Sequence, residues 1–139
     1  MSEQEIINKA YELFKAGSYA EAIPYYQKAV EIRKKYQQAS GLAMDLMELG
    51  TCYYYAQKIQ ECFQAKIDST MVFLQIHAND QQDKYLENIM KNFRFVGDVA
   101  YRVRASNIFK QMFDKILEEL KKLNDNYGLL LTYRSAIPT

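Results

Sequence analysis

The sequence predicts an all-α domain built from antiparallel helix hairpins, and three observations support this prediction. The 139 residues include only five Gly and two Pro, whereas an all-β domain of this length needs turn residues about every ten positions. Apolar residues recur at the three- and four-residue spacing of a helix face through most of the chain. The pattern of small and large residues also repeats after 40 positions.

The composition is that of one globular domain, which we expect to span residues 1–139. A chain that is 49% hydrophobic and 25% charged is neither disordered nor of low complexity. Its formal net charge of +1 gives no overall field that would favour nucleic acid or an anionic membrane. One His and two Cys leave little material for a zinc site or an acid–base relay. We therefore expect no catalysis, no cofactor and no metal.

The sequence carries no recognisable targeting or membrane signal. No apolar run approaches the roughly 18 residues that span a bilayer. The first five residues, MSEQE, lack the basic and apolar regions of a signal peptide. We expect a cytoplasmic protein that does not enter membranes, with Cys52 and Cys62 as free thiols. If these two cysteines face each other across a hairpin, they form either a redox pair or a close packing contact.

Two helices are expected in residues 3–38. The first covers about residues 3–16, and Gly17 ends it. Ser18 opens the second, because Glu21 three residues later completes a capping box in which each side chain accepts a hydrogen bond from the other residue's backbone N–H.

The next two helices are expected within residues 42–78. Ser40 and Gly41 form the break that precedes them, and a turn at Gln57 and Lys58 separates them.

Residues 80–123 are expected to form a third pair of helices. Asn79 and Asp80 cap the first of these, which has the cleanest apolar stripe in the chain. A weak break at Ser106 and Asn107 precedes the second.

The C-terminal segment, residues 125–139, is dense in apolar residues that need burial. It forms either a short helix that covers the last hairpin or an extended stretch of chain in a groove. The helix is favoured, because the terminal unit of a helical stack needs a cover. In the extended alternative, Leu129 to Ile137 would occupy the groove as an internal pseudo-ligand.

Shifting the sequence by 40 residues aligns small residues with small ones. Small residues are what a close crossing of two helices admits. The aligned pairs are Ala10 with Gly50, Ala22 with Cys62, and Ala29 with Ser69. A further shift of 47 residues places Gly97 at the position of Gly50. We therefore expect Gly50 and Gly97 to lie inside helices, at close crossings.

The first copy of this repeat resembles the tetratricopeptide repeat (TPR) family. Its most specific part is the run AGSYAEAI at residues 16–23. The period of 40 to 47 residues, against about 34 in the family, resembles that of extended-helix variants. The family's order of small, large, turn and aromatic residues is matched by Ala10, Leu13, Gly17, Tyr19, Ala22, Tyr26 and Ala29. The resemblance implies a short right-handed solenoid with repeats at about 3–38, 42–78 and 80–123.

The resemblance also implies a concave, peptide-binding face lined by the first helix of each hairpin. Tyr and Arg are the residues that binding surfaces enrich. Three consecutive tyrosines, Tyr53 to Tyr55, cannot all point inward, so at least one is expected to be exposed. The alternative that Tyr54 or Tyr55 packs between repeats stays open. The expected liners are Asn8, Tyr11, Lys15, Met47, Tyr54, Tyr55, Lys91, Arg94, Asp98, Tyr101 and Arg102.

Residues 91–110 hold the largest local charge, with five bases and one acid. Lys91 and Arg94 resemble the basic clamp with which some TPR domains grip an acidic peptide or its terminal carboxylate. His77, the one imidazole in the chain, is expected to pack against its neighbours rather than act as a base.

The predicted function is that of a protein-interaction adaptor that holds a peptide segment, of acidic character, in its groove. The first alternative is a structural domain that forms homo-oligomers through its Tyr and Met surface. The second alternative is RNA binding through the basic stretch and Tyr101, which the net charge of +1 disfavours.

Overall fold

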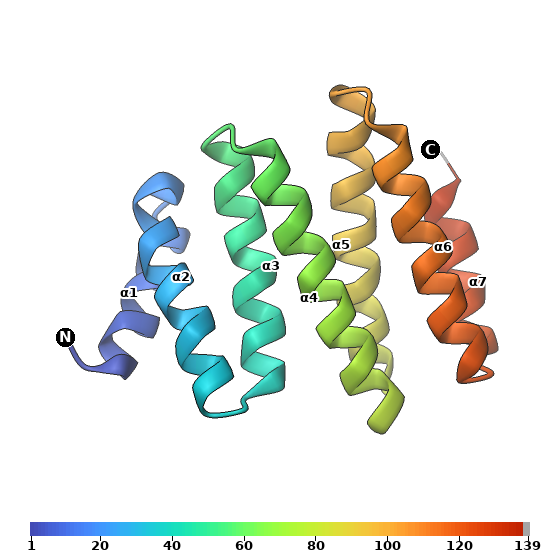
Figure 1. The fold of residues 1–139 in the computed structure, drawn as a ribbon, viewed down its shortest axis with the longest axis horizontal. Helices are drawn as coiled ribbons and strands as arrows, with labels where there is room; N and C mark the ends of the chain where they lie inside the picture. Colours follow the sequence, from blue (N-terminus) through green and yellow to red (C-terminus); the bar gives the residue numbers. More distant parts are fainter. Residues whose placement is uncertain (138–139) are drawn as a thin grey trace. The chain divides into compact units, whose positions relative to one another are not determined.

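A computed structural model describes residues 1–137 of the chain (Figure 1). These residues form seven α-helices and no strand, which confirms the predicted all-α class. None of these helices is both long enough and apolar enough to cross a membrane. The helices are α1 (Glu3–Lys15), α2 (Tyr19–Lys35), α3 (Ala39–Tyr55), α4 (Ile59–Asn79), α5 (Asp83–Arg102), α6 (Ser106–Lys122) and α7 (Asn126–Ala136).

The chain divides into two compact units, unit 1 (Met1–Val72) and unit 2 (Phe73–Thr139). The boundary falls within α4, so this helix contributes residues to both units. In unit 1, α2 packs against α1 and α3. In unit 2, α5, α6 and α7 pack against one another. Consecutive helices within each unit run antiparallel (Figure 1). The prediction of a single domain stays a prediction.

Unit 1 buries the small residues that the internal repeat places at helix crossings. A Cβ atom on Gly50 would lie 2.8 Å from Cγ of Lys66, so this glycine lets the two helices approach as predicted. The residues with no exposed surface include Ala10, Ala22, Ala29, Cys52, Cys62 and Ser69. Large side chains such as those of Tyr26 and Leu49 fill the space between them.

Unit 2 has a core of larger side chains, in which aromatic rings stack. The ring of Phe93 lies parallel to that of Phe109 at a centroid distance of 4.6 Å. Gly97 makes this packing possible, because a Cβ atom there would lie 2.7 Å from Cε1 of Phe109. The C-terminal segment forms helix α7, in agreement with the favoured prediction and not with the extended alternative. Residues 138 and 139 of the predicted cover segment lie outside the described residues.

Five of the six connections between helices in residues 1–137 share one backbone geometry. A residue with φ between 53° and 76° follows the helix. The next N–H then donates to the carbonyl oxygen five residues earlier, at 2.8–3.1 Å, which is the Schellman ending of a helix. The left-handed residues are Gly17, Gln37, Gln57, Arg104 and Asn124.

The spacing of these turns explains the internal repeat. Gly17, Gln37 and Gln57 are 20 residues apart, as are Arg104 and Asn124, so one hairpin takes 40 residues. The connection from α4 to α5 does not use this turn. It lengthens the interval between Gln57 and Arg104 to 47 residues, which is the second shift seen in the sequence.

Two predicted helix caps are wrong. Ser18 precedes α2, but its side chain makes no capping hydrogen bond. With φ −85° and ψ 61°, its backbone is outside the extended conformation that directs an N-cap side chain at the first turn. Asn79 and Asp80 do not cap α5, because α4 continues to Asn79. The residue before α5 is Gln82, whose backbone is extended.

The predicted break at Ser40 and Gly41 is also wrong, because both residues lie inside α3. The turn is formed by left-handed Gln37 instead. Gly41 leaves room for a neighbouring side chain, since a Cβ atom there would lie 2.6 Å from Nε of Arg33. Close packing, not a turn, therefore requires this glycine.

Candidate functional site

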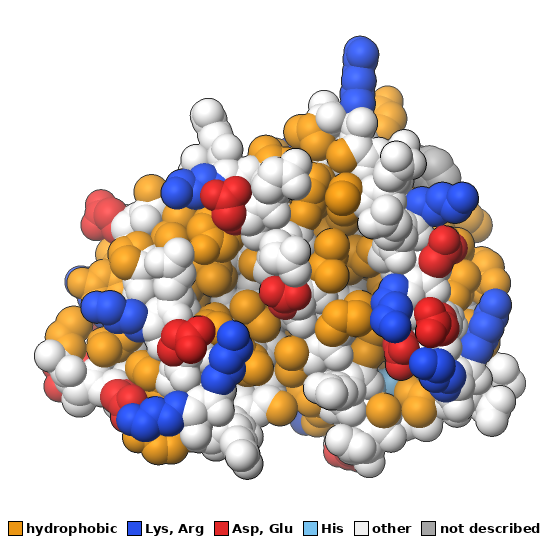
Figure 2. All heavy atoms as spheres, in the orientation of Figure 1, with side chains coloured by type: hydrophobic (Ala, Val, Ile, Leu, Met, Phe, Trp, Pro, Cys, Tyr) orange, Lys and Arg blue, Asp and Glu red, His pale blue; other side chains and the backbone are white. Residues whose placement is uncertain are grey.

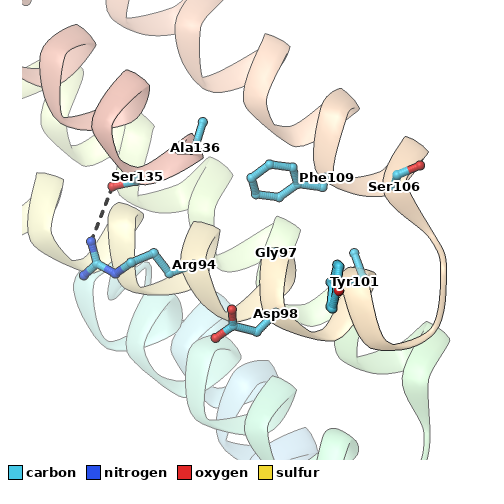
Figure 3. Close-up of a pocket in the computed structure, with 9 residues that line it drawn as sticks. Arg94, Gly97, Asp98, Tyr101, Ser106, Phe109, Ser135 and Ala136 are labelled. Atoms are coloured by element: carbon cyan, nitrogen blue, oxygen red, sulfur yellow. Dashed lines mark hydrogen bonds between the residues drawn. The ribbon is translucent and has the colours of Figure 1, made fainter. Parts of the chain in front are cut away.

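A pocket of about 670 Å³ lies in unit 2, between α5, the start of α6 and the end of α7 (Figure 3). Pockets of this size bind ligands when an apolar wall is combined with a few placed polar groups. The lining residues are Arg94, Gly97, Asp98, Ala100, Tyr101, Ser106, Phe109, Ser135 and Ala136.

Small residues are part of the pocket lining. They are Gly97 and Ala100 on α5 and Ala136 on α7. The Phe109 ring extends from α6 into the pocket (Figure 3). Its stacking on Phe93 fixes the ring, so the pocket has a firm aromatic wall.

Polar groups lie at the rim of the pocket. Nη1 of Arg94 donates a hydrogen bond to Oγ of Ser135 at 3.4 Å, which links α5 to α7 (Figure 3). The Ser135 hydroxyl in turn donates to Sδ of Met90 at 3.3 Å. Tyr101 is 88% exposed, and Asp98 is the one acidic residue among those that line the pocket.

A second pocket, of about 470 Å³, adjoins the first. The two pockets share Ala100, Tyr101 and Ser106. The second adds two exposed bases, Arg102 at the end of α5 and Arg104 in the following turn. The first pocket is therefore mainly apolar, while the second carries two guanidinium groups.

Four of the predicted liners lie at these two pockets. Arg94, Asp98 and Tyr101 line the first, and Arg102 lines the second. Lys91 is exposed on α5 but is not among the lining residues of either pocket.

The other six predicted liners belong to unit 1, and unit 2 alone builds the two pockets. Two of the six are largely sequestered. Met47 is only 8% exposed, and the hydroxyl of Tyr11 donates to Oδ1 of Asp45 at 3.0 Å. Asn8 and Lys15 are exposed on α1.

The remaining two unit 1 residues, Tyr54 and Tyr55, form an aromatic cluster. The ring of Tyr55 stacks on that of Tyr19 at 4.5 Å, and Tyr54 meets Tyr55 edge to face at 5.2 Å. Tyr55 keeps 58% of its surface exposed, in agreement with the expectation that at least one ring of this run faces outward.

Sequence reasoning did not assign several pocket residues to the site. It identified Gly97 as a crossing residue, but not as a residue that lines a pocket. Arg104 lies in the basic stretch that the charge count singled out. Ser106, Phe109, Ser135 and Ala136 carry no signal in a single sequence, because the packing of three helices brings them together.

Unit 1 holds an ion pair with a buried acid that the sequence did not indicate. Nε of Arg33 donates to Oδ2 of Asp45 at 3.0 Å, and Nη2 donates to the Tyr11 hydroxyl at 3.1 Å. Burial raises the pKa of the Asp45 carboxyl above its usual value, although the hydrogen bonds from Arg33 and Tyr11 act in the opposite direction. These groups connect α1, α2 and α3, and the Asp45 carboxyl among them has no exposed surface.

Lys66 is a second buried charge of unit 1. It is 3% exposed, and its Nζ donates to Oγ1 of Thr51 at 2.9 Å. Burial lowers the pKa of Lys66 to about 8. Cys52 and Cys62 are buried free thiols, and burial raises their pKa values to about 12 and about 11. Such thiols react slowly, which argues against the redox-pair alternative.

His77 is held as a structural residue of unit 2. Its Nδ1 accepts a hydrogen bond from the backbone N–H of Gln82 at 3.2 Å. Its Nε2 lies 2.6 Å from Oδ2 of Asp125, whose Oδ1 accepts from the N–H of Gly128 at 2.8 Å. The imidazole is 1% exposed, so this pair joins the end of α4 to the start of α7.

Comparison with protein-family models, curated proteins and solved structures finds no match to this chain. Among residues 1–137, no group of three or more His, Cys, Asp and Glu side chains is placed to hold a metal ion.

Proposed function

We propose that this chain is a TPR-like protein-interaction adaptor without catalysis of its own. In this proposal, unit 2 holds a peptide segment of a partner protein, and one apolar side chain of that segment enters the first pocket. The observation that carries the proposal is the pocket itself, in which the Phe109 ring and three small residues form an apolar wall beside Arg94 and Tyr101.

The chemistry of the rim supports a protein ligand. Exposed Tyr and Arg side chains provide rigid contact area and charge-assisted hydrogen bonds, and such residues dominate binding energy at protein interfaces. Tyr101 offers the contact area and Arg94 the charge, and the two residues lie about two turns apart on α5. An apolar side chain in the pocket would add roughly 1.5–3 kcal/mol when fully buried.

The distribution of charge favours an acidic segment over RNA. Three of the ten Lys and Arg residues of unit 2 line the pockets: Arg94, Arg102 and Arg104. Elsewhere both signs are interspersed, as the face drawn in Figure 2 shows for each unit. A local basic rim matches one or two carboxylates, whereas RNA binding draws on an extended basic surface.

A set of synthetic peptides tests the proposal. Each has nine residues of Gly and Ser with one central Leu, Phe or Trp, and the all-Gly/Ser peptide is the blank. Binding to the full chain is followed by NMR titration. We expect the aromatic peptides to bind and the blank not to bind. Ala136→Leu fills the pocket from its rim and should weaken binding at least tenfold.

Ala78→Leu is the matched control, because Ala78 is exposed on α4 and does not line the pocket. It should leave the affinity unchanged. The proposal is wrong if no apolar peptide binds better than the blank. It is also wrong if both Leu variants reduce the affinity equally.

A second candidate function, homo-oligomerisation, is favoured by the outer face of α7. Three large apolar side chains lie three residues apart there and keep 48–53% of their surface exposed: Tyr127, Leu130 and Tyr133. Ile137, directly after the helix, is 65% exposed. Exposed apolar stripes of this kind often mark contact surfaces. Light scattering over a range of concentrations tests it, because a constant monomer mass would exclude this function and a mass that rises with concentration would support it.

A further inference from the structure

We propose that the side chain that enters the first pocket is an aromatic one with a hydrogen-bond donor, the indole of Trp or the phenol of Tyr, and that the Asp98 carboxylate accepts this bond. This inference rests on the proposed function, since it assumes that the first pocket binds a side chain of a peptide. It goes further by naming the chemistry of that side chain and the residue that recognises it.

The first pocket contains a carboxylate that can accept a hydrogen bond from a ligand. Asp98 is exposed, and no group among residues 1–137 donates a hydrogen bond to its side chain. Arg94 precedes it by about one turn of α5, but Nη1 of Arg94 donates to Oγ of Ser135 at 3.4 Å. In Figure 3 the Arg94 guanidinium is directed at Ser135 and not at Asp98. The carboxylate is therefore accessible to a donor.

An aromatic wall lines the same pocket. Phe109 and Gly97 belong to this wall. The Phe109 ring is fixed, because it stacks on Phe93 at 4.6 Å, and Phe93 stacks in turn on Phe113 at 5.8 Å. A further ring packs well against such a surface, in an offset or edge-to-face arrangement. The pocket thus combines one acceptor with a rigid aromatic surface.

Few side chains match both features. Trp and Tyr combine a large apolar ring with one donor. Phe and Leu would leave the carboxylate without a bond, and Ser and Thr lack an apolar body for the wall to bury. Lys and Arg would bring a positive charge close to Arg94, Arg102 and Arg104, which line the two adjoining pockets, and like charges repel. A neutral donor on an aromatic ring is therefore favoured.

Isosteric peptides test the donor. Each has nine residues of Gly and Ser around one central residue. The first pair carries Trp or benzothienylalanine, in which sulfur replaces the indole N–H at nearly the same size and shape. The second pair carries Tyr or Phe, and two further peptides carry Lys or Arg. Dissociation constants are measured by fluorescence polarisation with the full chain and fluorescein-labelled peptides.

We expect the Trp peptide to bind about three- to tenfold more tightly than the benzothienylalanine peptide, which is the gain from one hydrogen bond. Asp98→Ala should abolish this preference and leave the affinity for benzothienylalanine nearly unchanged. Asp114→Ala is the matched control, because it removes an exposed acid of α6 that lines neither pocket, and it should retain the preference. A preference for Tyr over Phe would identify the phenol as the donor, whereas a difference in the Trp pair alone would identify the indole.

The outcomes separate the two levels of the proposal. If the aromatic peptides bind but neither pair shows a preference, the donor site is wrong and the apolar pocket stands. The donor site is also wrong if a Lys or Arg peptide binds more tightly than the Trp peptide, because Asp98 would then recognise a cation. Equal loss of the preference in Asp98→Ala and Asp114→Ala would contradict it as well. If no aromatic peptide binds, the proposed function itself fails.

Discussion

The side chain of Arg33 reaches Asp45 across the first turn of α3, where Nε lies 3.0 Å from Oδ2 and Gly41 leaves room for the guanidinium. Asp45 has no exposed surface. A charge at such a position is costly without a partner. The absence of a side chain at Gly41 is therefore what allows unit 1 to bury an acid.

Replacing Arg33 by Met should destabilise the fold by about 3–5 kcal/mol, because the Asp45 carboxylate would stay buried without its cation. Urea unfolding followed by circular dichroism measures the loss. Arg33→Met combined with Asp45→Asn should recover part of it. Lys34→Met is the control, since the Lys34 pair with Glu31 is exposed and is worth at most about 1 kcal/mol. Equal losses in Arg33→Met and Lys34→Met would contradict the prediction.

Gly41→Ala should act through the same pair. The new Cβ would meet Arg33 Nε at 2.6 Å, so the guanidinium must move away from Asp45. We expect a loss of about 1–3 kcal/mol, although Ala favours a helix over Gly by about 1 kcal/mol. Ser40→Ala, at the preceding exposed position, is the control and should change stability little. A stabilised Gly41→Ala protein would show that Arg33 relaxes without cost.

Lys66 should give unit 1 an unusual dependence on pH. Its folded pKa of about 8 is below the usual value of 10.5. Between these values the unfolded chain binds more protons than the folded chain, so stability from this group rises with pH. Below about pH 8 the cost of charging the buried amine is fully present.

Comparison with Lys66→Met isolates this effect, because the cysteines titrate in both proteins. We expect the stability of the variant relative to the native chain to fall by about 2 kcal/mol between pH 7 and pH 9.5. Urea unfolding at the two pH values measures the change. A difference that stays constant would mean that the Lys66 amine is solvated.

Replacing a left-handed glutamine of the turns by glycine should raise the stability of the chain. Gln37 and Gln57 have φ of 53° and 63°, a conformation that costs a non-glycine residue roughly 1 kcal/mol. Gln57→Gly should therefore raise the free energy of unfolding by about 0.5–1 kcal/mol. Lys58→Gly, one residue later and without positive φ, should instead lower it or leave it unchanged. Thermal unfolding of the two variants measures their stabilities. A Lys58→Gly protein that is more stable than Gln57→Gly would be evidence against the shared turn geometry.

Much of the fold follows from the sequence, because its signals are local. Gly50 and Gly97 were predicted at helix crossings from the repeat alone, and both lie against large side chains. The turn at Gln57 was predicted from its position between two apolar stripes. Its left-handed backbone was not, because Gln has no preference for that conformation.

The buried polar residues could not be predicted, since a charged residue on a helix normally faces solvent. Gly41 and Gly50 on α3 leave space for the side chains of Arg33 on α2 and Lys66 on α4, and Arg33 in turn is the partner of buried Asp45. The same holds for the candidate site. The basic stretch with Arg94 and Tyr101 was visible in the sequence, whereas the cavity beside it depends on how Phe109 and Ala136 pack in three dimensions.

Chemical-shift mapping of a bound peptide tests the central claim most directly. The ¹⁵N-labelled chain is titrated with the nine-residue Gly/Ser peptide that carries a central Phe. The account predicts that the largest amide shifts cluster at Gly97, Tyr101, Phe109 and Ser135. Shifts that centre on Tyr54 and Tyr55, or none at saturating peptide, would contradict it.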